Sequence, residues 1–188
     1  MYPPSAAYPH AIGLATLVSG MAAFLEGRWK NARQLLARGE AILLERCTGA
    51  VWELGTARLM RCASLFFMGQ FRELLSQVPA LLRDAERRGD LYEATAMGTR
   101  VAHACSLAAD QPGLAQSQVT RAMERWSAQG FHIQHWWSMI AQVEIALYAR
   151  EALKAWELLA RLWPALRRSL LQTDRGVHIF PNSGHHAY

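Results

Sequence analysis

Apolar residues recur along the chain at the three-to-four-residue spacing of amphipathic helices, and short breaks with glycine or proline separate the helical stretches. No stretch alternates apolar and polar residues with the period of two that a half-buried strand shows. The predicted fold class is therefore all-α. The spacing predicts eight helices, over about residues 8–26, 29–46, 50–68, 71–88, 91–109, 112–128, 132–149 and 151–172, the last bent or restarted at Pro164.

Two of the breaks share one order of residues, centred on Gly27 and on Gly69. In each, a glycine is followed by a polar residue and then by a large aromatic residue, Trp29 or Phe71. Glycine ends a helix readily because it can adopt a positive φ. The aromatic residue begins the next helix and is expected to pack back between the two helices. The motif predicts a helical hairpin in which Trp29 is largely buried.

A small or aliphatic residue early in each second helix marks a longer repeat. These residues are separated by 42, 41 and 40 positions along the chain, and they are Ala32, Leu74, Ala115 and Ala155. A nearly fixed period of helix–turn–helix units is typical of a solenoid. We expect four antiparallel helix pairs with a period of about 41 residues. This repeat domain spans residues 7–172, with a flexible start over 1–6 and an irregular, flexible tail over 173–188.

The first unit resembles a tetratricopeptide repeat (TPR), although the standard repeat is shorter, at about 34 residues. The resemblance rests on Gly20, Gly27, Trp29 and Ala32, which fall at the spacings of the tetratricopeptide pattern. It implies that Gly20 and Ala32 lie where the two helices of the hairpin approach most closely.

A narrower resemblance covers residues 11–172. Its distinctive stretches are residues 45–49, 52–54, 88–92, 126–136, 147–149 and 163–171. They resemble the tetratricopeptide-like region that follows the kinase and ATPase parts of large, eukaryotic-like serine/threonine protein kinases of myxobacterial type. The pattern departs after Asp174, where the family continues helical. The resemblance implies a regulatory or docking part whose partner is a protein or peptide, such as a kinase or ATPase domain.

Composition and charge exclude two classes of protein. Apolar residues make up 52% of the chain and charged residues 19%, which is typical of a globular domain and not of a disordered one. The net charge is +5, but basic residues are interspersed with acidic ones, as in residues 83–88. A nucleic-acid-binding protein usually concentrates its positive charge on one face. No nucleic-acid partner is therefore expected.

The cysteines and the most apolar run bear on the compartment. Cys47, Cys62 and Cys105 are widely spaced, form no C-x-x-C pair, and indicate a reducing environment. Residues 1–4 lack the charged segment of a signal peptide. Residues 11–25 form the longest apolar run, but a membrane span needs about 20 residues. We expect a cytoplasmic chain without membrane contact, in which this run is a buried helix.

The sequence predicts no enzyme activity. It lacks the glycine-rich loop and the H-R-D and D-F-G motifs of kinases, the phosphate-binding P-loop, and the G-x-S-x-G and H-E-x-x-H motifs of hydrolases. No catalytic residue, cofactor or metal site is predicted. His132 and His135 have the spacing of two metal ligands, but no third ligand is evident nearby. Packing and helix capping are favoured for both.

Function is expected on the concave face, which the first helix of each pair should line. The candidate partner-binding groove comprises Arg58, Arg61, Arg100, His103, Trp137 and Glu144. We expect a non-catalytic scaffold for protein–protein interaction, which would have a broad, open groove. The alternative is a helical-repeat domain that senses a small-molecule effector in a signalling ATPase or transcription regulator. A sensor of that kind would have an enclosed apolar cavity with a few polar groups.

Overall fold

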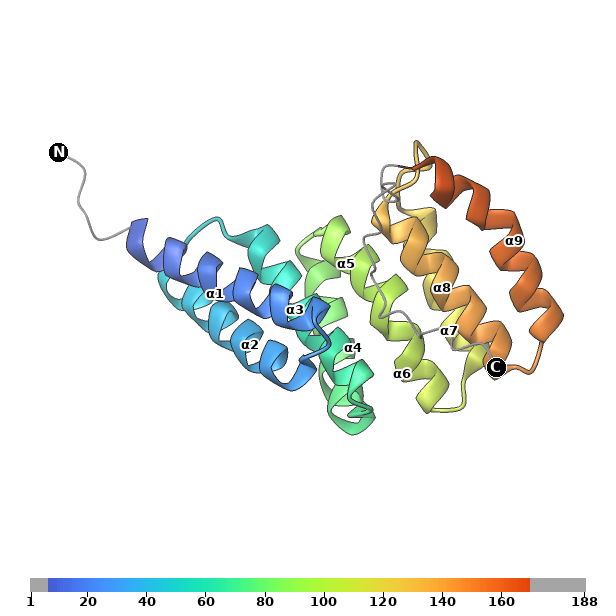
Figure 1. Cartoon of the computed structure of the whole chain (residues 1–188), viewed down its shortest axis with the longest axis horizontal. Coiled ribbons are helices and arrows are strands. Elements are labelled where there is room, and N and C mark those ends of the chain that lie inside the picture. Colours follow the sequence, from blue (N-terminus) through green and yellow to red (C-terminus); the bar gives the residue numbers. More distant parts are fainter. Residues whose placement is uncertain (1–6, 170–188) are drawn as a thin grey trace, which may run out of the picture.

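A computed structural model of the protein describes residues 7–169, and this range contains helices and no β-strand (Figure 1). The all-α prediction is confirmed, and all eight predicted helical stretches are present, because α5, η1 and α6 are consecutive segments of one stretch. The start over 1–6 and the tail over 173–188 lie outside the described residues. The elements are α1 (Ala7–Leu25), α2 (Trp29–Arg46), α3 (Val51–Phe67), α4 (Phe71–Arg87), α5 (Leu91–Met97), the π-helix η1 (Gly98–Ala102), α6 (His103–Ala108), α7 (Pro112–Glu124), α8 (Ile133–Tyr148) and α9 (Ala152–Arg168).

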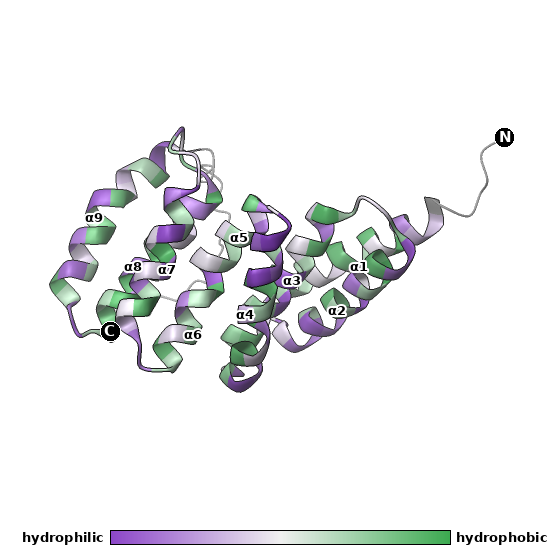
Figure 2. Cartoon of the chain, turned by 180° about the vertical axis from the view of Figure 1, so that it is seen from behind, coloured by the Kyte–Doolittle hydropathy of each residue, from purple (hydrophilic) through white to green (hydrophobic). Residues whose placement is uncertain are grey.

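The helices pack in consecutive pairs along an elongated array that runs from α1 and α2 at one end to α8 and α9 at the other (Figure 1). Contacts also join the first helices of successive pairs: α1 touches α3, α3 touches α5 and η1, and η1 and α6 touch α8. Hydrophobic and hydrophilic residues alternate around the helices, as is plain for α9 in Figure 2. The apolar faces meet between helices, which places the core along the whole array.

The same turn closes each helical hairpin among the described residues. Its central residue has a positive φ in every case: 76° at Gly27, 68° at Gly69, 57° at Asp110 and 62° at Arg150. In the first hairpin, Gly27 N donates to Phe24 O at 3.0 Å and Arg28 N donates to Ala23 O at 2.9 Å, and the other hairpins repeat this pair of bonds. These bonds satisfy carbonyl groups that the end of a helix would otherwise leave unpaired.

Glycines allow α1 and α2 to pack closely. A Cβ atom added at Gly20 would lie 2.8 Å from Leu36 Cγ, and one added at Gly39 would lie 3.2 Å from the backbone nitrogen of Leu17. Ala32 is fully buried in the same interface. The close approach predicted at Gly20 is confirmed, because any side chain there would overlap with Leu36.

The expectation that residues 11–25 form a buried helix is correct for one face of α1 only. Only 22% of the apolar window Tyr8–Leu25, whose mean hydropathy is 1.3, is buried. Val18 is 53% exposed and Leu25 is 62% exposed, because α1 is the terminal helix of the described array and its outer face meets no other helix. By length and composition alone, this helix could cross a membrane.

The structure refines the expectations about Trp29 and Pro164. Trp29 is partly buried, and its ring reaches past the first hairpin to stack on Phe67 at the end of α3, with 5.0 Å between ring centroids and an interplanar angle of 15°, so it does not pack between the first two helices alone. Of the two alternatives at Pro164, a restart is excluded, because α9 continues through it to Arg168, and a bend stays a prediction. The helix predicted over 112–128 ends at Glu124.

The largest cluster of buried side chains lies between α3, α4 and the stretch from α5 to α6, and it contains Cys62 and Cys105. Burial raises the pKa of Cys62 to about 12 and that of Cys105 to about 11. At neutral pH both thiols are therefore protonated and pack as small apolar groups.

His132 and His135 cap the N-terminus of α8. The backbone nitrogen of His132 donates to Nδ1 of His135 at 3.0 Å, and Trp126 Nε1 donates to Nδ1 of His132 at 3.0 Å. The capping role favoured from the sequence is confirmed. Burial lowers the pKa of His135 below its ordinary value of 6.5, and the neighbouring His132 lowers it further.

This cap should weaken in acid. Nδ1 of His135 accepts the bond only while it carries no proton, so its contribution is present above pH 6.5 and is lost as the pH falls through the lowered pKa. We expect a loss of about 1 kcal/mol in unfolding free energy between pH 7 and pH 5, as for other helix caps. The control is His135→Gln, which retains an acceptor at the same position but does not titrate. Urea unfolding at both pH values should show a smaller acid loss for the variant, and equal losses would contradict the assignment.

Candidate functional site

The structure separates the six predicted groove residues into two groups. Arg58 and Arg61 lie on α3, and both join an ion network with acidic residues of other helices. The remaining four lie where η1 and α6 meet α8. We treat these as two sites with different roles.

The first group is a partly buried network that joins α2, α3, α4 and the start of α5. Arg58 Nε donates to Glu40 Oε1 at 3.0 Å, and Arg61 Nε lies 3.2 Å from the other oxygen of the same carboxylate. Arg61 Nη1 also donates to Gln77 Oε1 at 2.6 Å. We call this set the α2–α5 ion network, and its charged members are Glu40, Arg58, Arg61, Asp84, Arg88 and Glu93.

Glu93 is the most buried member of the α2–α5 ion network, with 1% of its side chain exposed. Arg88 Nη2 donates to Glu93 Oε2 at 2.6 Å, and Nη1 of Arg58 lies 3.6 Å from Oε1. The bond to Glu93 is the main cause that raises the pKa of Arg88. Gly55 on α3 lies beside this carboxylate, and a Cβ there would meet Oε2 at 3.4 Å, an ordinary van der Waals contact.

These contacts change the role assigned to Arg58 and Arg61. Both were expected to line an open groove, but their guanidinium groups are held by carboxylates of the chain itself. The sequence could not show this, because Glu40 and Glu93 lie on helices before and after α3. Only the packing of these helices brings the two carboxylates to the arginines. We assign both arginines to the stability of the fold.

The second group, which we call the Arg100 site, comprises Arg100, His103, Trp137 and Glu144 together with Phe66 and Phe67 of α3. His103 is 1% exposed, and its Nε2 lies 2.6 Å from Glu144 Oε2. The expectation that His103 faces an open groove is therefore not met. Its role is to hold Glu144, which is itself partly exposed. Trp137 is half-buried and packs on the largest core cluster.

Arg100 is partly buried on an aromatic platform. Its guanidinium carbon lies 5.1 Å from the ring centroid of Phe67 and 5.9 Å from that of Phe66, within the range of a cation–π interaction. Burial lowers the pKa of Arg100, and the charge of Glu144 opposes that shift. Within residues 7–169, no carboxylate forms an ion pair with Arg100. Phe66 and Phe67, which sequence reasoning did not include, are therefore part of this site.

Arg100 lies in the π-helix η1, where the backbone departs from the regular α-helix of α5 and α6. Such segments occur frequently at functional sites because the extra residue in the turn redirects side chains. Gly98 begins η1 at a close contact with α7, since a Cβ there would lie 2.9 Å from Ala122 Cβ. The apolar and polar pattern of residues 91–109 predicted one uninterrupted α-helix and gave no sign of η1.

The side chains of the Arg100 site can bind an anion and pack against apolar groups. It combines a positive charge without an ion-pair partner among the described residues, aromatic rings, and a histidine–glutamate pair. Over residues 7–169, no group of three or more His, Cys, Asp or Glu side chains is placed to hold a metal ion. No protein-family model matches the chain, and it matches none of the curated proteins and none of the solved structures compared with it.

Proposed function

We propose that this chain is a tetratricopeptide-like solenoid that binds a protein or peptide and catalyses no reaction. Its partner would contact the surface around Arg100, on the side of the first helices of the hairpins. By the resemblance to bacterial serine/threonine kinases, a kinase or ATPase domain is the expected class of partner, and the expected location is the cytoplasm.

The turns support the solenoid. Their positive-φ residues Gly27, Gly69, Asp110 and Arg150 are separated by 42, 41 and 40 positions. The residue five positions after each turn, Ala32, Leu74, Ala115 or Ala155, is buried. Equal turns followed by equivalent buried positions are what a repeated helical hairpin requires.

The observation that carries the binding proposal is that Arg100 has no ion-pair partner among the described residues. Arg58 and Arg61 are held by acidic residues of the chain, whereas Arg100 rests on two aromatic rings without such a partner among the described residues. A partly desolvated arginine fixed by stacking loses little side-chain freedom on binding, and arginine is enriched among the residues that dominate interface energies. A carboxylate of the partner would complete the ion pair.

The test compares Arg100→Gln with Arg121→Gln, which removes the same charge from an exposed position on α7. Tagged full-length proteins would capture partners from a lysate of the source organism, with quantification by mass spectrometry. We expect partners of the wild type to be retained by Arg121→Gln and reduced at least tenfold by Arg100→Gln, because losing a charge-assisted bond at a desolvated site costs about 1.5–3 kcal/mol.

Circular dichroism would establish that both variants remain folded. Equal capture by Arg100→Gln and wild type would show that partners do not use this surface. The cation–π contacts of Arg100 make a small loss of stability the expected result, well short of unfolding.

A further inference from the structure

A second site lies at the far end of the array from α1, in an open surface cavity of about 840 Å³ between α5, the segment that joins α7 to α8, the start of α8 and the end of α9. Tyr92, Trp126, Phe131 and His132 give its wall an aromatic character. Ligand sites in proteins commonly have volumes of about 300–1,000 Å³ and aromatic walls with few polar groups. The Arg100 site shares no residue with this cavity.

The aromatic wall is held in place by contacts among its own residues and by one bond to His135, which lies outside the cavity. Trp126 donates a hydrogen bond to His132, and the two rings meet edge to face with 5.9 Å between centroids. The backbone of His132 is fixed in turn by the cap bond to His135. Tyr92 lies 6.4 Å from Trp126 between ring centroids. A wall that is already ordered loses little conformational freedom when a flat ring packs on it.

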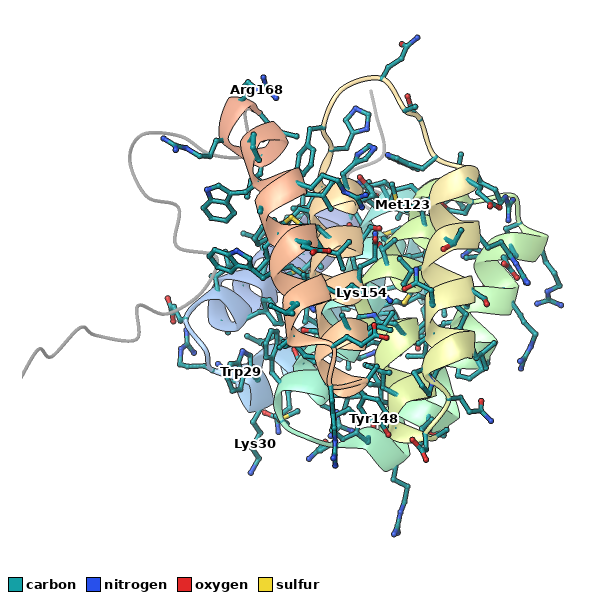
Figure 3. All side chains as sticks on the ribbon, turned by 90° about the vertical axis from the view of Figure 1, so that its right-hand side faces the viewer. Trp29, Lys30, Met123, Tyr148, Lys154 and Arg168 are labelled. Atoms are coloured by element: carbon teal, nitrogen blue, oxygen red, sulfur yellow. The ribbon has the colours of Figure 1, made fainter. Side chains whose placement is uncertain are left out.

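Two polar side chains at the cavity indicate which polar groups a bound aromatic ligand should have. Gln134 lines the cavity and is 1% exposed, and its amide nitrogen has no acceptor in the described part of the chain. A buried donor without an acceptor costs free energy, and rotation of the Gln134 side chain toward the cavity would let a ligand oxygen recover it. Arg168 is the last residue of α9 (Figure 3) and lines the cavity, and only its Nε is engaged, in a 3.2 Å bond to Pro164 O.

The charge of the cavity favours an anion. None of the residues that line it is acidic, and Arg168 forms no ion pair within residues 7–169. The terminal nitrogens of its guanidinium group can therefore donate to a carboxylate. We propose that this cavity binds an aromatic carboxylate, with the ring against Trp126 and Phe131, an oxygen acceptor at Gln134 and the negative charge at Arg168.

The probe is 8-anilinonaphthalene-1-sulfonate, a fluorescent aromatic anion, titrated into the full-length protein. We expect Arg168→Gln to weaken its binding about fivefold, the effect of one partly exposed ion pair. The matched control is Arg167→Gln, because Arg167 is exposed at the adjacent position and does not line the cavity. Equal affinities for the two variants would overturn the proposal.

Gln134→Leu gives a second, independent readout. It removes the unpaired donor, so we expect an unchanged or higher melting temperature together with weaker probe binding. A purely structural glutamine would lower the melting temperature when replaced and leave probe binding unchanged, and this result would contradict its assigned role.

Two competitors distinguish the source of the carboxylate. Indole-3-acetate represents a free small molecule, and a glycine–serine peptide with a C-terminal tryptophan represents the end of a protein chain. Displacement of the probe by indole-3-acetate supports a small-molecule ligand, and displacement by the peptide alone supports a protein terminus. If neither displaces the probe, the cavity does not bind aromatic carboxylates.

Discussion

Glu93→Leu should lower the free energy of unfolding by about 3–5 kcal/mol, because it removes a carboxylate that is buried between Arg58 and Arg88. Leucine approximates the volume but leaves the positive charges of both arginines without this partner. Part of the cost can be relieved, since Arg88 is partly exposed and also contacts Asp84 and Asp90. Arg58 is largely buried and has less access to water.

Guanidinium chloride unfolding of wild type and variant measures this loss. The control is Glu86→Leu, since Glu86 is exposed and its closest cation, Arg125, lies 4.0 Å away. A surface pair of that kind contributes at most about 1 kcal/mol. If the two variants lost equal stability, the α2–α5 ion network would contribute nothing beyond ordinary surface charge.

The architecture could be predicted from the sequence because its determinants are local. Gly27 and Gly69 mark their turns through a backbone conformation that glycine adopts without strain. Asp110 and Arg150 adopt the same conformation without being glycine, and there the position came from the spacing of the buried residues Ala115 and Ala155. Periodicity and turn chemistry both act over a few residues, so one sequence is enough to detect them.

The candidate site was harder to predict because its properties depend on contacts between distant residues. Arg58, Arg61 and Arg100 look alike in the sequence, each on the first helix of a pair. They differ only in what other helices place beside them: Glu40 reaches the first two, while Phe66 and Phe67 lie beneath the third. An arginine side chain can bind an anion at any of the three positions. The packing of the helices decides whether a carboxylate of the same chain already pairs with it.

Because Gly20 and Leu36 are in close contact, substitutions at the two positions should have non-additive effects on the free energy of unfolding. Leu36→Ala should cost about 2–5 kcal/mol, because Leu36 is fully buried and its removal leaves a cavity. Gly20→Ala should cost about 1–3 kcal/mol, because the added methyl group would lie 2.8 Å from Leu36 Cγ and the helices must shift to admit it.

The double variant Gly20→Ala/Leu36→Ala should be more stable than the sum of the two losses predicts, by about 1 kcal/mol or more. In that variant the new methyl group occupies space that the leucine side chain has vacated, although the Leu36 backbone nitrogen, 3.1 Å from the added Cβ, still limits the fit. Urea unfolding of the four proteins gives the coupling energy. The comparison pair is Gly113→Ala with Leu36→Ala, because a Cβ at Gly113 meets nothing within 4 Å. Additive losses in both pairs would mean that α1 and α2 separate freely at Gly20, and that the close approach does not determine how the first hairpin packs.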